Sequence, residues 1–387
     1  MNLYCSATLL KLLTDLFQNI DEIMSVNRKI IFHYPGPFYD VLDTGEKKRP
    51  KRMYEAFCEL GYDVYSIIGN YSERKIKIKA IEDQLDEFEF IYSENTNLPL
   101  RFSGKRHIPI WGNADFKLYK LAYKKKIPHG VFCRDIYWLY KDFIKEVGYL
   151  KYLLALPFYL EELKLYNSYC HKVFVPSQRF IDSLIFINKR KCVSLPPAGR
   201  ISQVQDTLVY NSGDSPLKFI YVGSVNPPFY DLTLLLKEIK QFNKSIKLTI
   251  VTREDVWNKF SEYYSPLPSN VEVMHITGIK LEKKIHEAHL SIIYLIETQY
   301  RKLAMPIKFF EAIGYQVPVI SYGDSAVSDF IKKYDIGWVV NSNDTNIFKY
   351  LLQNPEEIEN KRKNISRICS EHTWEKRAER VVEVLTC

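Results

Sequence analysis

Residues 304–321 read AMPIKFFEAIGYQVPVIS and form the most informative stretch of the chain. Proline suits the first position of a helix and glycine the left-handed position past its end, so Pro306 and Gly314 predict a two-turn helix between them. Apolar runs of strand length flank it at Leu290–Ile296 and Val317–Ile320, which is typical of buried parallel strands. The stretch therefore predicts a helix that begins at the carboxyl edge of an α/β sheet.

Lys308 and Glu311 lie three residues apart on one face of this predicted helix. Open α/β sheets bind ligands at this edge, where a helix N-terminus offers free N–H groups and a partial positive charge to phosphate. Lys308 would add a full charge, and Glu311 could accept hydrogen bonds from a vicinal diol such as a ribose. The alternative is a surface ion pair worth about 0.3 kcal/mol. We interpret the helix as a clamp for a nucleoside diphosphate.

The run PIKFFEAIGYQVPVIS resembles the donor-binding signature of GT-B glycosyltransferases, especially the family-four group. The resemblance implies two Rossmann-like domains facing each other across a cleft, with Glu311 on the nucleotide ribose and Lys308 at the diphosphate. Retaining members usually carry a second glutamate eight positions earlier, where this chain has Leu303, and the nearest acidic residue is Glu297. The stereochemical outcome stays open.

The predicted second domain alternates strand and helix, with strands at Leu217–Val222 and Ile246–Val251 and a helix at Asp231–Phe242. Asp231 suits the N-cap of that helix, because its short carboxylate can accept from the first backbone N–H groups. The alternation predicts parallel strands joined by crossover helices.

A loop after the first of these strands is the expected partner of the donor. Gly223 lets the backbone approach a ligand, and Ser224 follows it. Many family-four members place an Arg and a Lys in this loop, whereas this chain has Ser224 and Pro228. Arg253, Arg301 and Lys302 are the candidates for the missing charge, although each could be an ordinary surface residue.

The first domain is predicted to begin with strand Ile30–Tyr34, a helix entered at Pro50 and strand Val64–Ile68. No GxGxxG fingerprint follows the first strand, so a dinucleotide site is not supported. The run DTGEKKRPKRMYEAFCELGYDVYSIIG resembles the N-terminal domain of capsular and lipopolysaccharide glycosyltransferases. In that family the first loop lies under the acceptor, which implies acceptor contacts for Gly36 and Pro37.

A predicted strand at His129–Arg134 ends at Asp135. A carboxylate at the end of a parallel strand faces the ligand crevice, so Asp135 is the candidate base for an acceptor hydroxyl, with Arg134 beside the acceptor. The alternative is an aspartate that caps the next helix or pairs with Arg134. The histidines that compete for the role of base are His33, His107 and His129.

Residues 101–152 hold twelve Lys and Arg against four Asp and Glu, a net charge of +8 that equals that of the whole chain. The same window holds twelve aromatic residues, and the apolar run Leu153–Leu160 follows it. This composition suits an anionic membrane surface, where each nearby basic residue contributes about 1 kcal/mol. It also fits a solvated basic face; a nucleic-acid groove is disfavoured because no recognised binding module accompanies it.

The 387 residues, 46% of them hydrophobic, suffice for two cored domains. Helical spacing continues over residues 139–169, and breaker-rich residues mark a linker near residue 200. The predicted organisation is a leader or upstream extension at 1–23, an acceptor-binding domain at 24–199, a linker at 200–216, a nucleotide-sugar domain at 217–363 and a terminal helix at 364–387 that crosses back to the first domain.

Seven scattered cysteines form no Cys-x-x-Cys pair, so neither a disulfide framework nor a zinc site is indicated, and a reducing cytosol is favoured. The resemblance implies a hexosyltransferase. Neither an Asp-x-Asp motif nor a cofactor fingerprint occurs, so we expect it to be cofactor-free and metal-independent. We expect it to use a UDP-sugar and a glycan or polyprenyl-linked glycan acceptor in surface polysaccharide biosynthesis, in the cytoplasm or peripherally at the inner membrane face. The alternatives are a nucleotide-sugar epimerase and an inactive membrane-docked scaffold.

Overall fold

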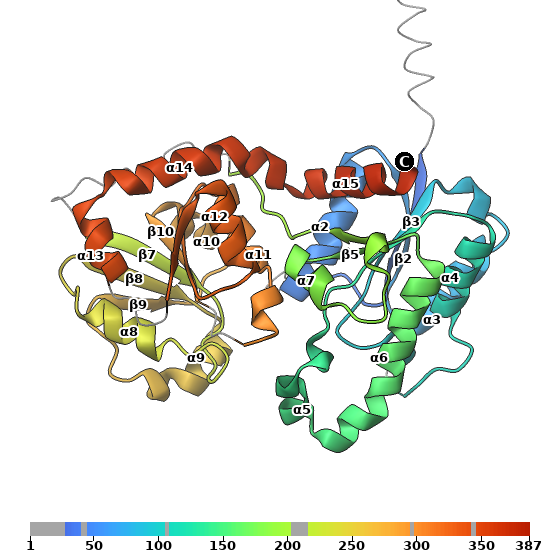
Figure 1. The fold of residues 1–387 in the computed structure, drawn as a ribbon, viewed down its shortest axis with the longest axis horizontal. Helices are drawn as coiled ribbons and strands as arrows, with labels where there is room; N and C mark the ends of the chain where they lie inside the picture. The colour runs from blue at the N-terminus through green and yellow to red at the C-terminus, as the bar shows by residue number, and fades with distance from the viewer. Residues whose placement is uncertain (1–27, 40–44, 105–107, 203–215, 295–297, 342–345) are drawn as a thin grey trace, which may run out of the picture.

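The computed structural model describes residues 28–39, 45–104, 108–202, 216–294, 298–341 and 346–387, and the elements form two α/β units side by side (Figure 1). Several predictions fall outside the described residues. These are the leader at 1–23, His107, Glu297 and most of the linker, residues 203–215.

The first unit is built on a sheet of six parallel strands in the order β2-β1-β3-β4-β5-β6. The strands are β1 Lys29–Tyr34, β2 Asp63–Ile68, β3 Phe90–Glu94, β4 His129–Phe132, β5 Lys172–Val175 and β6 Cys192–Ser194. Its helices are α2 Gly45–Glu59, α3 Tyr71–Ile81, α4 Ala114–Lys124, α5 Lys141–Val147, α6 Tyr149–Tyr169 and α7 Gln178–Ser183. The strands are rich in buried apolar residues because helices cover both faces of a parallel sheet.

A second parallel sheet of six strands has the order β12-β11-β10-β7-β8-β9. The strands are β7 Leu217–Val222, β8 Ile246–Val251, β9 Val271–Met274, β10 Leu290–Ile293, β11 Val319–Tyr322 and β12 Gly337–Val340. Its helices are α8 Thr233–Lys240, α9 Glu254–Phe260, α10 Gly278–His286, α11 Ile307–Gly314, α12 Ala326–Tyr334, α13 Asn346–Gln353 and α14 Glu356–Ile368. The predicted two-domain α/β fold is confirmed.

In the second sheet β8 and β9 are added on one side of β7, whereas β10, β11 and β12 are added on its other side. The order of the strands therefore reverses between β7 and β10. Such a switch point leaves a crevice at the carboxyl ends of the two neighbouring strands, because the helices that follow them cover opposite faces. Helix α11 follows β10 in sequence, so its first turn lies at this crevice.

The last helix, α15 Trp374–Thr386, leaves the second unit and lies along the first (Figure 1). It packs against α2, and its Arg377 Nε donates to the carbonyl of Pro196 at 2.9 Å. The C-terminal segment thus joins the two units a second time, in addition to the chain that links them near residue 200.

Two predicted helix boundaries in the first unit were wrong. Helix α2 begins at Gly45 and not at Pro50, because the proline is accepted within the helix. Proline has no N–H to give to the residue four positions earlier, and the carbonyl of Glu46 instead accepts from Arg134 Nη2 at 3.3 Å. The continuous helix predicted over 139–169 is two helices, α5 and α6, which Gly148 separates at a φ of 86°.

Helix α11 differs from its prediction in how it ends. Pro306 is the N-cap, Gly314 is the last helical residue, and the left-handed residue is Gln316 at a φ of 56°. Gly314 is needed for a different reason: a Cβ there would lie 2.1 Å from the carbonyl oxygen of Arg200. A backbone contact that is remote in sequence therefore explains this glycine.

Smaller differences concern strand and helix ends. The strands predicted at His129–Arg134 and Leu290–Ile296 end at Phe132 and Ile293, respectively. The helix predicted at Asp231–Phe242 is α8, which begins at Thr233 and ends at Lys240. Asp231 still accepts from the N–H of Thr233 at 2.9 Å, although Leu232 holds the N-cap position.

A fully buried polar network ties the first unit together. Asp115 accepts from Arg74 through both carboxylate oxygens, at 2.8 and 2.7 Å, and its Oδ1 lies 3.0 Å from Nε2 of His33. Ser93 joins His33 to His129 at 3.1 and 2.8 Å. Burial alone would raise the pKa of Asp115, but the hydrogen bonds from Arg74 and His33 hold it well below its ordinary value. The contacts of His33 and His129 therefore favour a structural role over that of a catalytic base.

We expect Asp115→Asn to destabilise the protein by about 3–5 kcal/mol, since it leaves the Arg74 guanidinium buried without its counter-charge. The free energy of unfolding in urea measures the loss. Glu82→Gln is the matched control, because it removes the exposed pair with Lys117 and should cost less than about 1 kcal/mol. Equal losses in the two variants would contradict the structural role of the network.

Candidate functional site

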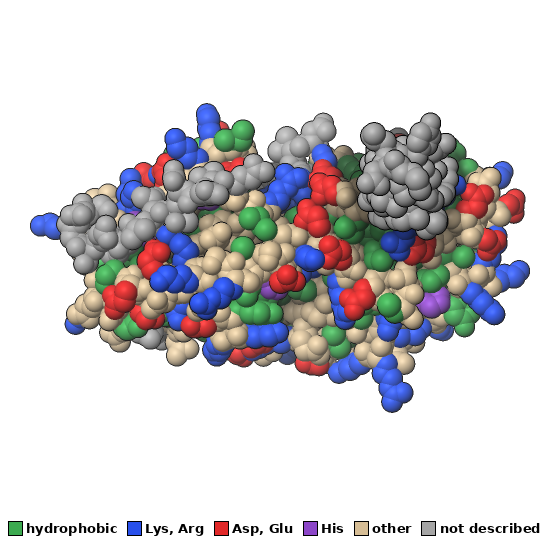
Figure 2. Space-filling model, turned by 90° about the horizontal axis from the view of Figure 1, so that it is seen from above, with side chains coloured by type: hydrophobic (Ala, Val, Ile, Leu, Met, Phe, Trp, Pro, Cys, Tyr) green, Lys and Arg blue, Asp and Glu red, His purple; other side chains and the backbone are tan. Residues whose placement is uncertain are grey.

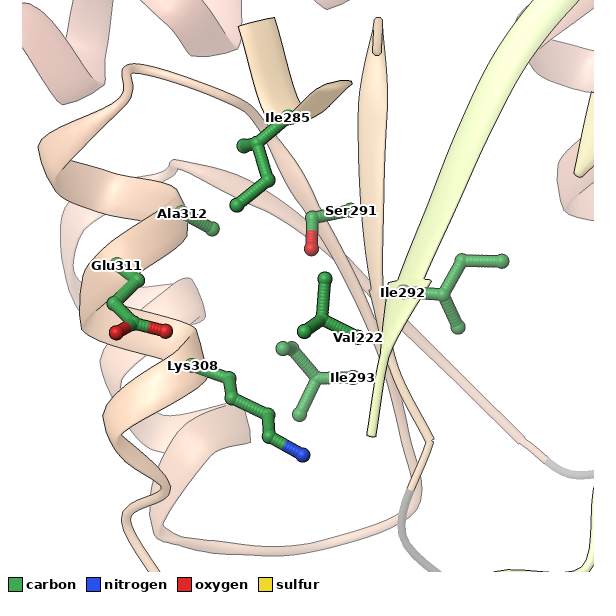
Figure 3. A pocket seen from close by; sticks show the side chains of 8 residues that line it. All are labelled: Val222, Ile285, Ser291, Ile292, Ile293, Lys308, Glu311 and Ala312. Carbon is green, nitrogen blue, oxygen red and sulfur yellow. The ribbon is translucent and has the colours of Figure 1, made fainter. Parts of the chain in front are cut away.

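The first turn of α11 lies at the switch point of the second sheet, as the order of its strands requires. A small cavity there is lined by Lys308 and Glu311 of α11 and by strand residues that include Val222, Ser291 and Ile293. Figure 3 shows Lys308 extending from α11 toward the strand ends that carry Val222 and Ile293, with Glu311 one turn further along the same helix. The structure thus brings together the two residues that the sequence proposed as a clamp.

Lys308 lies in a crowded, cationic environment. Burial is the main cause that lowers the pKa of its ammonium to about 8, with further lowering from the positive charges of Lys48 and Arg253. Glu311 acts in the opposite direction. A dianionic ligand bound here would favour the charged ammonium, so the site gains most from an anion when Lys308 is protonated.

Lys48 reaches this site from the other domain. Its Nζ donates to Oε1 of Glu311 at 2.5 Å, and both side chains are largely enclosed. Lys48 lies on α2, in a run of basic residues that we read only as the entrance to a helix. Its role was missed because the contact spans 263 positions, and the sole signal was a basic cluster directly after Gly45.

The loop after β7 is held by its own contacts. The N–H of Gly223 donates to the carbonyl of Val251 at 2.9 Å, and a Cβ at Gly223 would lie 2.6 Å from the hydroxyl of Tyr221. That hydroxyl donates to the carbonyl of Ser224 at 2.7 Å. The Ser224 side chain in turn bonds to Asn226, so the loop has a fixed shape beside the crevice.

The two arginines proposed for the missing charge have different positions. Arg301 donates to the carbonyl of Phe229 and lies 4.5 Å from the ring centre of Tyr230, so its guanidinium fixes the end of this loop. Arg253 is exposed at the start of α9, 3.6 Å from Asp255, and its charge acts on Lys308. Arg253 is therefore the arginine that shares the surroundings of the clamp.

A larger cavity of about 310 Å³ lies between the two domains. Met305, Pro306 and Ile307 line it from the second domain, directly before Lys308 in sequence. From the first domain it is lined by residues that follow β4 or open α2, among them Gly45, Glu46, Arg49, Arg134 and Asp135. The two cavities thus share the start of α11, one on the sheet side and one facing the first domain.

Asp135 contributes a carboxylate to the larger cavity. Its Oδ1 accepts from the N–H of Tyr137 at 2.5 Å, which is the capping contact that we weighed as the alternative. Burial raises its pKa, while this bond and the hydroxyl of Tyr300 partly oppose the rise. A raised pKa brings a carboxylate nearer to the range that suits a general base, so capping and proton transfer are compatible here.

Arg134 lines the same cavity, but Gly36 and Pro37 line neither cavity. Gly36 accepts from the N–H of Gly69 at 3.0 Å and lies against the ring of Tyr34. Among the predicted acceptor residues the structure therefore gathers Arg134 and Asp135 and leaves the first loop apart.

Leu303 explains a departure from the glycosyltransferase pattern in physical terms. It is 5% exposed, belongs to the apolar cluster of the first domain, and its carbonyl accepts from Ser177 Oγ at 2.9 Å. Retaining members of the GT-B family usually have a carboxylate at this position. In this chain the same position makes an apolar contact between the domains. Over the described part of the chain, no three His, Cys, Asp or Glu side chains are grouped so as to hold a metal ion.

Comparisons with known proteins agree with this geometry. A family model described as group 1 glycosyl transferases matches residues 216–353, which is the unit that contains the clamp. No curated protein sequence matches the chain. Among solved structures, Anabaena HepE in complex with UDP and glucose has a TM-score of 0.60 at 11% identity, over 93% of this chain and 99% of that one.

Two further structures extend the likeness. WaaG, a glycosyltransferase involved in lipopolysaccharide biosynthesis, has a TM-score of 0.56 at 13% identity, over 92% of this chain and 99% of that one. Sucrose-phosphate synthase from Thermosynechococcus elongatus has a TM-score of 0.60 at 13% identity, over 92% of this chain and 98% of that one. The fold is therefore GT-B, as predicted. Residues 216–353, which make up most of the second domain, match the model of the group 1 glycosyl transferases.

Proposed function

We propose that the protein transfers a sugar from a UDP-sugar, held by the second domain, to a hydroxyl of a glycan or lipid-linked glycan held by the first. The observation that carries this proposal is the start of α11, where Lys48 pairs with Glu311 and the charges of Lys48 and Arg253 act on the buried ammonium of Lys308. Arg253 lies 3.6 Å from Asp255, so three cations stand against two carboxylates, and the surplus positive charge favours a diphosphate at this helix N-terminus. The complexes of HepE with UDP and with UDP-glucose support uridine as the nucleoside.

In this proposal the larger cavity receives the reacting groups. The sugar on the β-phosphate enters beside Met305 and Pro306, and Asp135 stands on the opposite wall as the candidate base for the acceptor hydroxyl. Closure of the domains around the cavity would exclude water, which protects the donor from hydrolysis. The role of WaaG in lipopolysaccharide biosynthesis supports a surface polysaccharide as the product.

We expect Glu311→Ala and Lys308→Ala each to weaken UDP binding by about 1.5–3 kcal/mol, because each removes a charged contact in an enclosed site. Isothermal titration with UDP measures the loss, which is about 10- to 100-fold in affinity. Lys363→Ala, an exposed lysine on α14, is the control and should bind UDP as the wild type does. The clamp is refuted if both site variants keep the wild-type affinity.

Metal-independent transfer is the second part of the proposal. The ammonium of Lys308 and the N-terminus of α11 can offset the charge of the leaving diphosphate. We therefore expect turnover of UDP-sugar to continue after EDTA treatment. Loss of all turnover, restored by added manganese or magnesium, would show that a divalent ion supplies the charge instead.

A membrane-facing surface is the third part, and the structure changes where we place it. Several aromatic residues of the basic window, including Phe116, Tyr119 and Trp138, belong to buried core, and Lys125 pairs with Asp86 at 2.8 Å. The lysines at 124–126 end α4, where Tyr123 contacts Tyr169 at the end of α6. They therefore lie near the opposite end of α6 from its exposed apolar residues.

The exposed apolar residues gather where α5 meets α6. Tyr149, Leu150, Leu153 and Leu154 are 66%, 72%, 44% and 66% exposed. This corner projects from the first domain on the side away from α14 and α15 (Figure 1). By contrast, the face that carries α14 and α15 shows mixed positive and negative side chains with small hydrophobic areas (Figure 2).

Basic residues accompany this corner. Lys141, Lys145 and Lys151 are all exposed. Among the described residues, no helix is both long and apolar enough to span a membrane. An apolar ridge flanked by lysines suits shallow insertion into an anionic bilayer, which fits a lipid-linked acceptor.

We expect the protein to sediment with anionic vesicles, less so with neutral vesicles or at high salt, because salt screens the lysine charges. The double variant Leu150→Asp and Leu154→Asp should abolish sedimentation. A variant with Lys124, Lys125 and Lys126 changed to Glu is the control and should retain most of it. Wild-type protein that ignores vesicles, or a control that loses as much as the double variant, would contradict docking through α5 and α6.

A further inference from the structure

Arg49 and Arg134 carry buried nitrogen atoms that the protein itself leaves without partners. Arg49 is 3% exposed, and among the described residues neither its Nη1 nor its Nη2 has a hydrogen-bond partner. Nη1 of Arg134 is also buried and has no hydrogen-bond partner within this part of the chain, although Oε1 of Glu46 lies 3.8 Å away. A buried donor without a partner typically costs about 1–3 kcal/mol, so three such nitrogens at one cavity call for a physical reason.

The remaining contacts of Arg49 hold its guanidinium in place. Nε donates to Oε1 of Glu94 at 3.0 Å, and the guanidinium carbon lies 3.4 Å from the ring centre of Phe132. The hydroxyl of Tyr92 donates to the same Oε1 at 3.0 Å. The hydroxyl of Tyr92 also interacts with Arg49. These contacts hold the guanidinium in place, while neither terminal nitrogen meets the geometry of a hydrogen bond with a described residue.

The local balance of groups favours a ligand that accepts hydrogen bonds. Against the three unpaired nitrogens stands one unpaired buried oxygen, Oε2 of Glu94, which lies 3.8 Å from Nη2 of Arg134. Arg377 adds a further buried cation nearby. Its guanidinium hydrogen-bonds to backbone carbonyls and to the ring of His372.

Two other carboxylates line the cavity but are otherwise engaged. Asp135 accepts from Tyr137 and interacts with the hydroxyl of Tyr300. The Glu46 side chain is 49% exposed and lies 3.8 Å from Arg134 Nη1, beyond hydrogen-bond distance. Neither one occupies the terminal nitrogens of Arg49.

The position of the cavity identifies which part of a substrate would meet these arginines. Arg49 and Arg134 line the same cavity as Met305, Pro306 and Ile307. Those three residues immediately precede Lys308, so a group attached to a diphosphate at Lys308 enters this cavity first. With the donor proposed above, that group is the sugar to be transferred.

We propose that the transferred sugar is acidic and that its carboxylate pairs with the guanidinium groups of Arg49 and Arg134. A planar carboxylate can take two parallel N–H bonds from one guanidinium, which suits the two free terminal nitrogens of Arg49. The donor is then a nucleoside diphosphate uronic acid. This inference rests on the proposed glycosyltransferase function and adds the class of sugar.

Isothermal titration with UDP, UDP-glucose and UDP-glucuronic acid tests the inference. These two sugars differ only in the group at C6, a hydroxymethyl or a carboxylate, so their affinity ratio isolates the acidic group. We expect the wild-type protein to bind UDP-glucuronic acid at least about tenfold more tightly than UDP-glucose, as a charge-assisted pair in a buried site requires.

Variants locate the preference. Arg134→Met should reduce the ratio toward one while UDP itself binds as before, since the proposed site of UDP is at Lys308, which does not line this cavity. Arg49→Met leaves Glu94 buried without its partner, so the double variant Arg49→Met with Glu94→Gln is the version that avoids an unpaired buried charge. Arg52→Met on the same helix, which lines neither cavity, is the control and should keep the wild-type ratio.

The possible results distinguish failure of the acidic-sugar proposal from failure of the proposed glycosyltransferase function. If UDP binds and the two UDP-sugars bind equally, the acidic sugar is refuted and the glycosyltransferase proposal stands. If they bind equally while free glucuronic acid binds to the UDP-saturated protein, the carboxylate belongs to the acceptor, and the assignment to the donor is wrong. If UDP does not bind, the proposed donor site itself is refuted.

Discussion

A close backbone contact between α11 and the chain segment that connects the domains determines where the site faces. A Cβ at Gly199 would lie 2.1 Å from the carbonyl oxygen of Phe310, and one at Gly314 would lie 2.1 Å from that of Arg200. The N–H of Ser202 donates to the carbonyl of Gly314 at 3.1 Å. Side chains at either glycine would push the segment away, so the two glycines fix α11 against the path of the chain between domains.

The other end of α11 is held by contacts with the first domain. Leu303 packs in the first-domain cluster and bonds to Ser177, while Arg179 on α7 contacts Asp324 at 2.7 Å and Asp329 at 2.5 Å. The arginine pairs are partly exposed and therefore screened by salt, whereas the Leu303 contact is apolar and buried. The domains are thus joined at this edge by an apolar contact near the site and by weaker charges outside it.

The sequence allowed the fold to be predicted because its signals are local. The strands Leu217–Val222 and Ile246–Val251 match the structure, since continuous apolar runs record burial on both faces of a parallel sheet. The pair Lys308 and Glu311 was visible because three residues of helix place them on one face. Gly314 was identified as important, although the reason was its contact with Arg200 and not its own backbone angle.

Features that depend on long-range contacts could not be predicted in this way. Lys48 meets Glu311 and Leu303 enters the opposite domain only because the two domains pack together, and Arg49 meets Glu94 across 45 positions within the first domain. The basic window was equally ambiguous, because composition does not separate the buried ring of Trp138 from the exposed ring of Tyr149. Burial and pairing, rather than the count of charges, decide which of these residues can meet a ligand or a membrane.

The contact between Lys48 and Glu311 links the occupancy of the site to the position of the domains. In the free protein each group is the partner of the other across the domain interface, so neither is left as an uncompensated charge. In the proposed complex, the ribose would compete with Lys48 for the carboxylate of Glu311, and the diphosphate would offer that ammonium a new partner close by. Because one charged contact replaces another, the exchange costs little, and the first domain keeps an ionic contact with the site throughout. Lys48 thereby supplies from the first domain a cation that the loop after β7, with Ser224 and Pro228, does not contain.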